Sequence, residues 1–290
     1  MVKKFEMKEI CIEDKVKISA YLDSYQIQAS ELSFTNLYVW RKKYNFHYVI
    51  LNDFLWIINV KDDVYYLSQP IGDYDNKEEL FISINMMKNF LEHRPFIMKK
   101  VEERFLEILM KSDLSCLIKE VRNDFDYIYD FEGLKNLSGK TYRKKKNHIN
   151  QFLKKYDWHY TDISADRFSD VKVICDQWFV DVNDEKKAID DLLLNYETLD
   201  VSGGILYIED RPVAFIVGEE LNKETLVIHF EKGNNNYHGV YPMVFHEYIN
   251  SINNYSYINR EQDLGIAGLR KSKLSYHPVK FIKKYNITII

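Results

Sequence analysis

Apolar positions in the first half of the chain alternate between helical and strand-like spacing. Ile12, Val16 and Ala20 recur every four residues, and residues 34–44 follow a 3.6-residue period, so two helices are expected to open this half. Two apolar runs joined at Asn52-Asp53 predict a pair of strands. A further strand is expected before the turn at 69–72, which contains Pro and Gly. The later elements are expected as strands at 47–50, 54–60, 65–68 and 96–98, and as helices at 78–91 and 102–110.

The second half shows the same two periodicities in a different order. A polar and aromatic stretch at 122–133 has the character of a junction, so we expect domains at 1–125 and 126–290. Helices mixed with a central run of antiparallel strands predict an α/β or α+β layered fold. The expected helices lie at 141–156, 168–180, 186–199, 239–252 and 266–275, and the expected strands at 158–161, 204–208, 213–218, 225–231, 257–259 and 287–290.

Composition narrows the class of protein. With 290 residues, of which 46% are hydrophobic and 15% aromatic, the chain can bury full hydrophobic cores and is not a disordered protein. Its three cysteines are far apart, which argues against a disulfide framework or a zinc site. The first residues lack a signal-peptide core, and no window has the roughly 18 continuous apolar residues of a bilayer span. We therefore expect a cytoplasmic protein without an integral membrane segment.

Charge is distributed unevenly along the chain. The net charge of −4 gives no overall attraction to polyanions. However, residues 140–156 carry seven basic side chains and no acid, and residues 264–290 carry six more, again with no acid. These segments are either ordinary solvated helix faces or parts of a site for an anionic ligand.

Lys145 is predicted to lie on the apolar side of its helix. At about 100° per residue, the apolar stripe of this helix passes through Tyr142, Ile149 and Phe152. Lys145 falls inside the stripe, and Lys146 falls at its edge. A lysine in such a stripe either extends its charge to the rim or meets an anion.

The last predicted helix also places cations on its apolar side. Arg270 and Lys273 lie inside its stripe, and two inward cations at this spacing require a negative charge between them. Strand alternation puts Glu231 on the same face as His229 in a preceding strand. The available carboxylates are those of Glu231, Glu261 and Asp263. Together these groups make either a structural charge network or a polar cleft that positions an anion or accepts a proton.

Other motifs carry less information. The loop at 232–239 ends at Gly239 before a predicted helix, so it is either a phosphate-binding turn or a plain loop rich in glycine and asparagine. The histidines show no metal-ligand spacing, so no metal site is expected. The chain has neither a nucleophile elbow nor a P-loop.

Four segments resemble a known family. They are DYIYDFEGLKNLSGKTYRKKKNHINQF at 126–152, VIHFEKG at 227–233, YINREQDLGIAGLRKSKLSYHPVKFIKKY at 257–285 and, more weakly, SFTNLYVWRKKY at 33–44. These segments are similar to the C-terminal, cytoplasmic catalytic region of bacterial phosphatidylglycerol lysyltransferases and to stand-alone proteins related to it.

The resemblance implies two tandem GNAT-like folds and aminoacyl-tRNA as the donor. By position, it implies functional roles for Lys145, Lys146, Asn147, Glu231, Lys232, Glu261, Asp263, Arg270 and Lys273. Two features depart from the family pattern. The membrane-spanning half of the lipid enzymes has no counterpart here. The acyl-CoA loop pattern is met only by residues 236–241, where Asn and Tyr replace its first and last residues.

These observations favour an acyl or aminoacyl transferase in which an amine or hydroxyl attacks an activated ester. Glu231 or Asp263 is expected to act as the base or to orient the nucleophile, and Glu261 joins them as a catalytic candidate. Arg270 and Lys273 are expected to hold the donor phosphate or the developing oxyanion, while the basic helix grips a tRNA acceptor end. The acceptor is expected to be a small molecule or a lipid headgroup. The alternatives are a CoA-dependent N-acetyltransferase, with acyl-CoA as donor at Gly239, and a non-catalytic binding or regulatory module.

Overall fold

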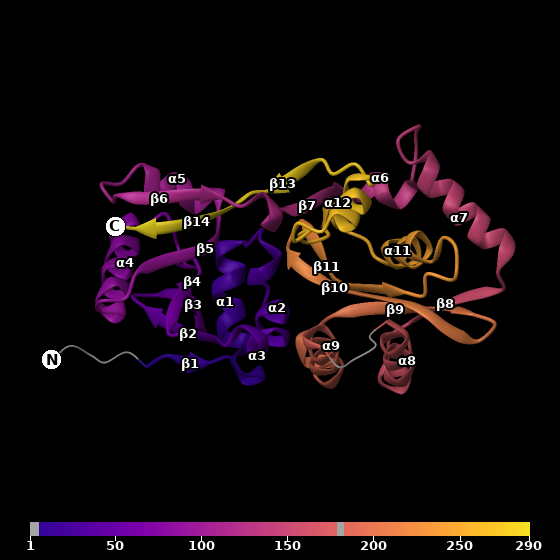
Figure 1. Ribbon diagram of the computed structural model, residues 1–290, viewed down its shortest axis with the longest axis horizontal. Coiled ribbons are helices and arrows are strands. Elements are labelled where there is room, and N and C mark those ends of the chain that lie inside the picture. The colour runs from indigo at the N-terminus through magenta and orange to yellow at the C-terminus, as the bar shows by residue number, and fades with distance from the viewer. Residues whose placement is uncertain (1–5, 179–182) are drawn as a thin grey trace. The chain divides into compact units, whose positions relative to one another are not determined.

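The computed structural model describes residues 6–178 and 183–290, and the chain divides into two compact units (Figure 1). Unit 1 comprises Met1–Asp126, Gln262–Gly265 and Ile282–Ile290, and unit 2 comprises Tyr127–Glu261 and Ile266–Phe281. The sequence patterns predicted one domain at 126–290, whereas in the structure two short segments of this range, Gln262–Gly265 and Ile282–Ile290, belong to unit 1.

Unit 1 contains a seven-stranded mixed sheet in the order β1-β2-β3-β4-β5-β14-β6. Its strands are β1 (Lys8–Glu9), β2 (Phe46–Leu51), β3 (Phe54–Lys61), β4 (Val64–Leu67), β5 (Phe96–Glu102), β6 (Cys116–Glu120) and β14 (Lys284–Ile289). Its helices are α1 (Lys15–Tyr25), α2 (Phe34–Val39), α3 (Arg41–Tyr44), α4 (Lys77–Leu91) and α5 (Glu103–Met110). The predicted helix at 34–44 is therefore two helices that meet at Trp40.

The first helix exists as predicted, but the predicted apolar face is wrong. Ile18, Leu22 and Tyr25 are buried, whereas Val16 is 83% exposed. The four-residue repeat of small and branched residues therefore marked the solvent side, because the larger side chains on the other face fill the core more effectively.

The last strand is held in unit 1 by a buried ion-pair cluster. Lys284 in β14 donates to Asp126 at 2.7 Å and also pairs with Glu31, and the Lys284 side chain is fully buried. A buried cation is tolerated when carboxylates surround it, and removing either partner would leave an uncompensated charge. This cluster explains why the chain returns to unit 1 after unit 2.

Unit 2 contains a second seven-stranded mixed sheet, in the order β13-β7-β12-β11-β10-β9-β8. Its strands are β7 (Asp126–Asp130), β8 (Trp158–Asp162), β9 (Ser202–Ile208), β10 (Arg211–Asn222), β11 (Thr225–Gly233), β12 (Tyr257–Asn259) and β13 (Lys280–Ile282). Its helices are α6 (Phe131–Asn136), α7 (Arg143–Lys155), α8 (Phe168–Trp178), α9 (Asp184–Leu194), α10 (Tyr196–Leu199), α11 (Val240–Ser251) and α12 (Ala267–Leu274). The last two residues of the helix predicted at 168–180 lie outside the described residues.

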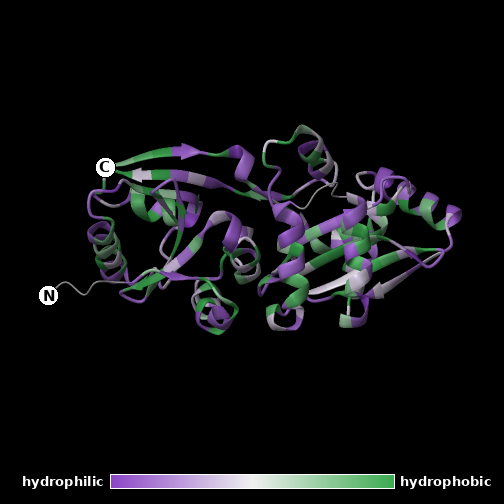
Figure 2. Cartoon of the chain, turned by 60° about the horizontal axis from the view of Figure 1, so that its bottom comes forward, coloured by the Kyte–Doolittle hydropathy of each residue, from purple (hydrophilic) through white to green (hydrophobic). Residues whose placement is uncertain are grey.

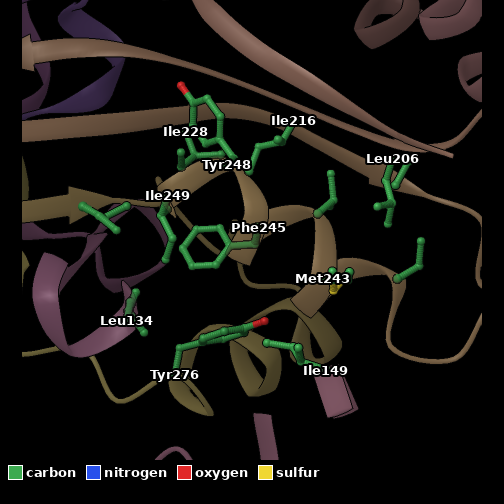
Figure 3. Close-up of a cluster of buried hydrophobic side chains, with 14 of the residues drawn as sticks. Leu134, Ile149, Leu206, Ile216, Ile228, Met243, Phe245, Tyr248, Ile249 and Tyr276 are labelled. Carbon is green, nitrogen blue, oxygen red and sulfur yellow. The ribbon is translucent and has the colours of Figure 1, made fainter. Parts of the chain in front are cut away.

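Helices cover both faces of the sheet in unit 2. Figure 1 shows α8 and α9 on one face and α11, with α7 and α12 beyond it, on the other. Hydrophobic residues concentrate in the strands, while the helices alternate between hydrophobic and polar positions (Figure 2). On the α11 face, Phe245 and Ile249 pack with strand residues such as Ile216 and Ile228 and with Tyr276, forming one buried cluster (Figure 3).

Candidate functional site

Two neighbouring strands of unit 2 separate and leave a space that polar side chains span. β11 and β12 are parallel and pair only from Thr225–Tyr257 to Val227–Asn259. Beyond these pairs β11 continues beside β10 to Gly233, whereas β12 ends at Asn259. Glu231 from β11 and Arg260, the first residue after β12, meet across the separation. We call the group formed by Lys145, Glu231, Arg260 and Tyr276 the β11–β12 cluster.

Arg260 is the central cation of this cluster. Its Nη2 lies 2.5 Å from Glu231 Oε2, and the two side chains are 11% and 13% exposed. The guanidinium lies 4.3 Å from the ring centroid of Phe245 and 4.4 Å from that of Tyr276. Burial opposes its charge, but the Glu231 carboxylate outweighs this effect and raises the pKa of Arg260 further. Among the described residues, Arg260 Nη1 is buried and has no hydrogen-bond partner, a state that costs about 1–3 kcal/mol unless a ligand accepts from it.

Lys145 contributes a second cation from α7. Its Nζ lies 3.6 Å from the centroid of the Tyr276 ring, in agreement with the inward position that the helical projection predicted. Burial, followed by the charge of Arg260, lowers the pKa of Lys145 to about 8, although Glu231 acts in the opposite direction. Burial also raises the pKa of Tyr276 to about 12, against the effect of Arg260. The lowered pKa favours the uncharged form of Lys145, which is able to accept a proton.

His229 in β11 forms a clamp by contacting one carboxylate in β10 and another just after β12. His229 Nδ1 lies 3.0 Å from Glu261, and its Nε2 lies 2.8 Å from Glu219 in β10. A β-bulge interrupts the β10–β11 register here, since Val217 pairs with Phe230 and Gly218 with Ile228. The extra residue shifts the side-chain alternation. The bulge interrupts the alternation that was predicted to put His229 and Glu231 on one face, and the two side chains contact different groups.

Each of the three predicted carboxylates pairs with a cation or a histidine. Glu231 pairs with Arg260, Glu261 with His229, and Asp263 with Arg122 at 3.6 Å. Asp263 is fully buried, accepts from the Gly265 N–H at 2.8 Å and belongs to unit 1.

In the last helix, Lys273 lies inward and Lys271 is exposed, as the helical projection predicted. Lys273 is buried and its Nζ donates to the Arg260 carbonyl, while the Lys273 carbonyl accepts from Tyr129 Oη at 2.8 Å. Lys273 thus holds the backbone that positions Arg260. Arg270 is half-buried on the same helix. Of the predicted apolar stripe, Tyr276 is buried, whereas Ile266, Leu269 and Leu274 are exposed.

The remaining predicted ligand-binding residues lie on α7 and β11. Lys146 and Asn147 line a pocket of about 450 Å³ together with Lys140 and Arg143 at the start of α7. Lys232 pairs with Glu185 at 2.9 Å, so β11 is tied to α9.

The loop before α11 is poorly suited to a phosphate. Gly239 caps the helix with a left-handed φ of 86°, and a Cβ there would lie 2.8 Å from the His148 carbonyl of α7. Several backbone N–H groups of the loop already donate to protein acceptors; these are the amides of Asn236, Tyr237, His238 and Val240. A pyrophosphate would have to displace these bonds, which disfavours acyl-CoA as the donor.

Unit 1 has an equivalent strand separation, which its own side chains fill. β4 and β5 are parallel and pair only at Tyr66–Ile97 and Leu67–Met98. Past these pairs, Glu102 accepts from Tyr25 Oη at 3.1 Å and from the Ala29 N–H at 2.6 Å, and its own N–H donates to Gln69. These groups satisfy one another, in contrast to Arg260 in unit 2. The candidate site is therefore in unit 2.

Sequence reasoning missed Arg260, the residue on which the cluster depends. The available signal was a charged residue directly after two buried strand residues, Ile258 and Asn259. His229 was considered as a metal ligand and as a neighbour of Glu231 on one strand face. In the part of the chain that the structure describes, no group of three or more His, Cys, Asp or Glu residues could hold a metal ion.

A family model described as phosphatidylglycerol lysyltransferase, C-terminal, matches residues 23–288. The chain belongs to this family. A crystal structure of a conserved protein of unknown function from Bacteroides thetaiotaomicron is 33% identical, with a TM-score of 0.89 over 99% of this chain and 100% of that one. The structure of L-PGS from Bacillus licheniformis is 14% identical, with a TM-score of 0.69 over 95% of this chain and 92% of that one.

The expected tandem GNAT-like fold is confirmed. A tandem GNAT protein from the clavulanic acid biosynthesis pathway is 7% identical over 98% of each chain, with a TM-score of 0.52.

An uncharacterized protein of Mycoplasmoides gallisepticum is 29% identical over 178 residues, which cover 57% of this chain and 56% of that protein. Among residues 6–178 and 183–290, no helix combines the length and the apolar character that a bilayer crossing requires.

Proposed function

We propose that this chain transfers an aminoacyl group from aminoacyl-tRNA to an amine or hydroxyl acceptor, and that the β11–β12 cluster holds the reacting ester. The observation that carries the proposal is the buried Arg260 Nη1, which has no partner among the described residues and lies beside a lysine of lowered pKa. Family membership supports a transferase of this class.

The cluster supplies the groups that acyl transfer requires. The acceptor nitrogen or oxygen attacks the ester carbonyl carbon, negative charge develops on the carbonyl oxygen, and the bond to the ribose oxygen then breaks. Arg260 would donate to the developing oxyanion, where a fixed, buried donor is most effective. The uncharged fraction of Lys145 would accept the proton of the attacking group and return it to the leaving ribose oxygen. Glu231 keeps the guanidinium in position.

The pocket at the start of α7 would bind the tRNA backbone. Lys140, Arg143 and Lys146 line it, and single-stranded acceptor-end phosphates would displace counterions there. Three such contacts predict that log K falls with log salt at a slope of about −2. The acceptor is proposed to be a small molecule or a lipid headgroup.

Transfer can be tested with a panel of tRNAs, each charged with one radiolabelled amino acid. The assay measures the protein-dependent loss of label from the tRNA when phosphatidylglycerol vesicles or small amines are present as acceptors. We expect label loss with at least one charged tRNA. Lys145→Met should abolish it, whereas Lys144→Met, which alters an exposed neighbour on α7, should not.

Two results would count against the proposal. Equal label loss with Lys145→Met and wild type would remove the cluster from the reaction. If no charged tRNA loses label or binds at low salt, the non-catalytic binding or regulatory module becomes the better account.

A further inference from the structure

The two peptide groups that flank the Cα of Arg260 are held by hydrogen bonds within unit 2. The Arg260 N–H donates to the Tyr127 carbonyl at 3.0 Å, and the Arg260 carbonyl accepts from Lys273 Nζ. The next N–H, that of Glu261, donates to Oδ1 of the buried Asn259 at 2.8 Å. The guanidinium therefore projects from a backbone whose hydrogen-bonding groups already have partners.

Glu261, the residue directly after Arg260, has an unusual backbone conformation for its type. Its φ is 55°, in the left-handed region that glycine, asparagine and aspartate enter more readily than other residues. Another residue type keeps this conformation when its surroundings stabilise it, and such residues concentrate at functional sites. One stabilising contact is made by the Glu261 side chain, because its Oε1 lies 3.0 Å from His229 Nδ1.

His229 is placed for this contact by a β-bulge. The β10–β11 register shifts between Val217 and Gly218, and His229 is the extra residue of β11 at this point. A bulge of this kind re-aims a side chain. The imidazole lies between two carboxylates, with Nδ1 at Glu261 and Nε2 2.8 Å from Glu219 in β10. Because its side chain is only 1% exposed, His229 contacts protein carboxylates and not a substrate.

The charged form of His229 suits this position. Burial opposes the charge, but hydrogen bonds to Glu219 and Glu261 outweigh burial and raise the pKa of His229 to about 9. Both ring nitrogens of the charged form donate, whereas the neutral ring has one donor and one acceptor. An acceptor nitrogen that faces a carboxylate oxygen repels it, so loss of the proton would release one of the two carboxylates.

We propose that His229 is a positioning residue for Arg260 and acts through the left-handed backbone of Glu261. His229 holds the Glu261 carboxylate, and this side chain fixes the backbone directly after Arg260. The fixed backbone directs the guanidinium toward Glu231. The kinetic consequence rests on the proposed transfer, because a displacement of about 1 Å in a reacting group lowers a rate by about a hundredfold.

Carbon-detected NMR of arginine-labelled protein tests the positioning without any donor. The side-chain signal of Arg260 is assigned by its absence in Arg260→Lys. We expect this signal to shift in Glu261→Gly, which accepts the left-handed conformation but lacks the carboxylate. It should stay near the wild-type position in Glu261→Gln, whose amide oxygen still accepts from His229. The control is His159→Gln, a change at an exposed histidine of β8, which should leave the signal unchanged.

A pH titration of the same signal keeps the inference testable if the Glu261 variants do not fold. The titration uses Lys145→Met, because Lys145 lies close to Arg260 and titrates at about pH 8. Arginine itself stays charged throughout this range. The Arg260 signal should move with a midpoint near pH 9, where His229 loses its proton.

Transfer kinetics supply a second measurement. His229→Gln should lower kcat by about tenfold or more, because Arg260 is displaced from the reacting ester. KM for charged tRNA should stay near the wild-type value, since the tRNA backbone is proposed to bind at the start of α7. An Arg260 signal that is unchanged both in Glu261→Gly and across the titration overturns the inference. Absence of transfer by the wild type would count against the proposed function, and the Arg260 signal would still decide the positioning.

Discussion

His229 should make the stability of the protein depend on pH in the alkaline range. Burial lowers its pKa, but hydrogen bonds to Glu219 and Glu261, together with their charges, outweigh burial and raise the pKa to about 9. The unfolded chain has the ordinary value of about 6.5. Because the folded pKa is the higher one, the stabilisation is fully present below pH 6.5 and is lost as pH rises through 9.

The magnitude follows from the size of the shift. A difference of about 2.5 pKa units, at 1.36 kcal/mol per unit, gives about 3 kcal/mol of stabilisation at the acid end of the range. The value needs little discount for solvent screening, since the His229 side chain is 1% exposed. Lys145 titrates in an overlapping range with the opposite sign, because its folded pKa lies below its ordinary value.

Urea unfolding of wild type and His229→Gln at several pH values between about 6 and 9.5 separates these contributions. The difference in unfolding free energy between the two proteins should be largest at pH 6 and should shrink by about 3 kcal/mol by pH 9.5. The exposed His159 provides the control variant, His159→Gln, which should leave the pH dependence unchanged. A constant difference between wild type and His229→Gln across the range would refute a charged histidine in the clamp.

Three further perturbations test other parts of the account. Glu231→Gln should lower the unfolding free energy by about 3 kcal/mol, because it leaves the buried Arg260 charge without its carboxylate. The loss should be smaller in the double variant Arg260→Met/Glu231→Gln, and equal losses measured by calorimetry would contradict a buried pair. Gly239→Ala should lower the melting temperature, since its φ is 86° and its Cβ would meet the His148 carbonyl. Gly268→Ala, which has open space around it in α12, should instead raise the unfolding free energy by up to about 1 kcal/mol. The rate of transfer should rise with pH through about 8 as Lys145 loses its proton, and a flat profile from pH 6 to 9 would exclude Lys145 as the base.

Local patterns were sufficient to predict most elements of the fold. The hairpin expected at 47–50 and 54–60 corresponds to β2 and β3, and the run expected at 213–218 lies within β10. These strands have continuous apolar sequences bounded by turn residues, and that signal depends only on neighbours in the chain.

Features set by distant contacts could not be predicted in this way. Strand alternation does not reveal the bulge at His229, because the bulge depends on register with β10. The helical projection places Lys273 inward, where its Nζ donates to the Arg260 carbonyl, but it does not show that Leu269 and Leu274 are exposed. Arg260 itself becomes a candidate only when Glu231, Phe245 and Tyr276 are seen around it.

The most direct test of the central claim is binding of an uncleavable donor. A short acceptor-stem RNA that carries its amino acid through an amide bond at the 3′ end should raise the melting temperature of wild type and of Lys144→Met, because a ligand that binds only the folded state stabilises it. The account predicts that this rise is lost in Lys145→Met and that RNA without an amino acid gives a smaller rise. An equal rise in Lys145→Met and wild type would contradict the placement of the donor ester at the β11–β12 cluster.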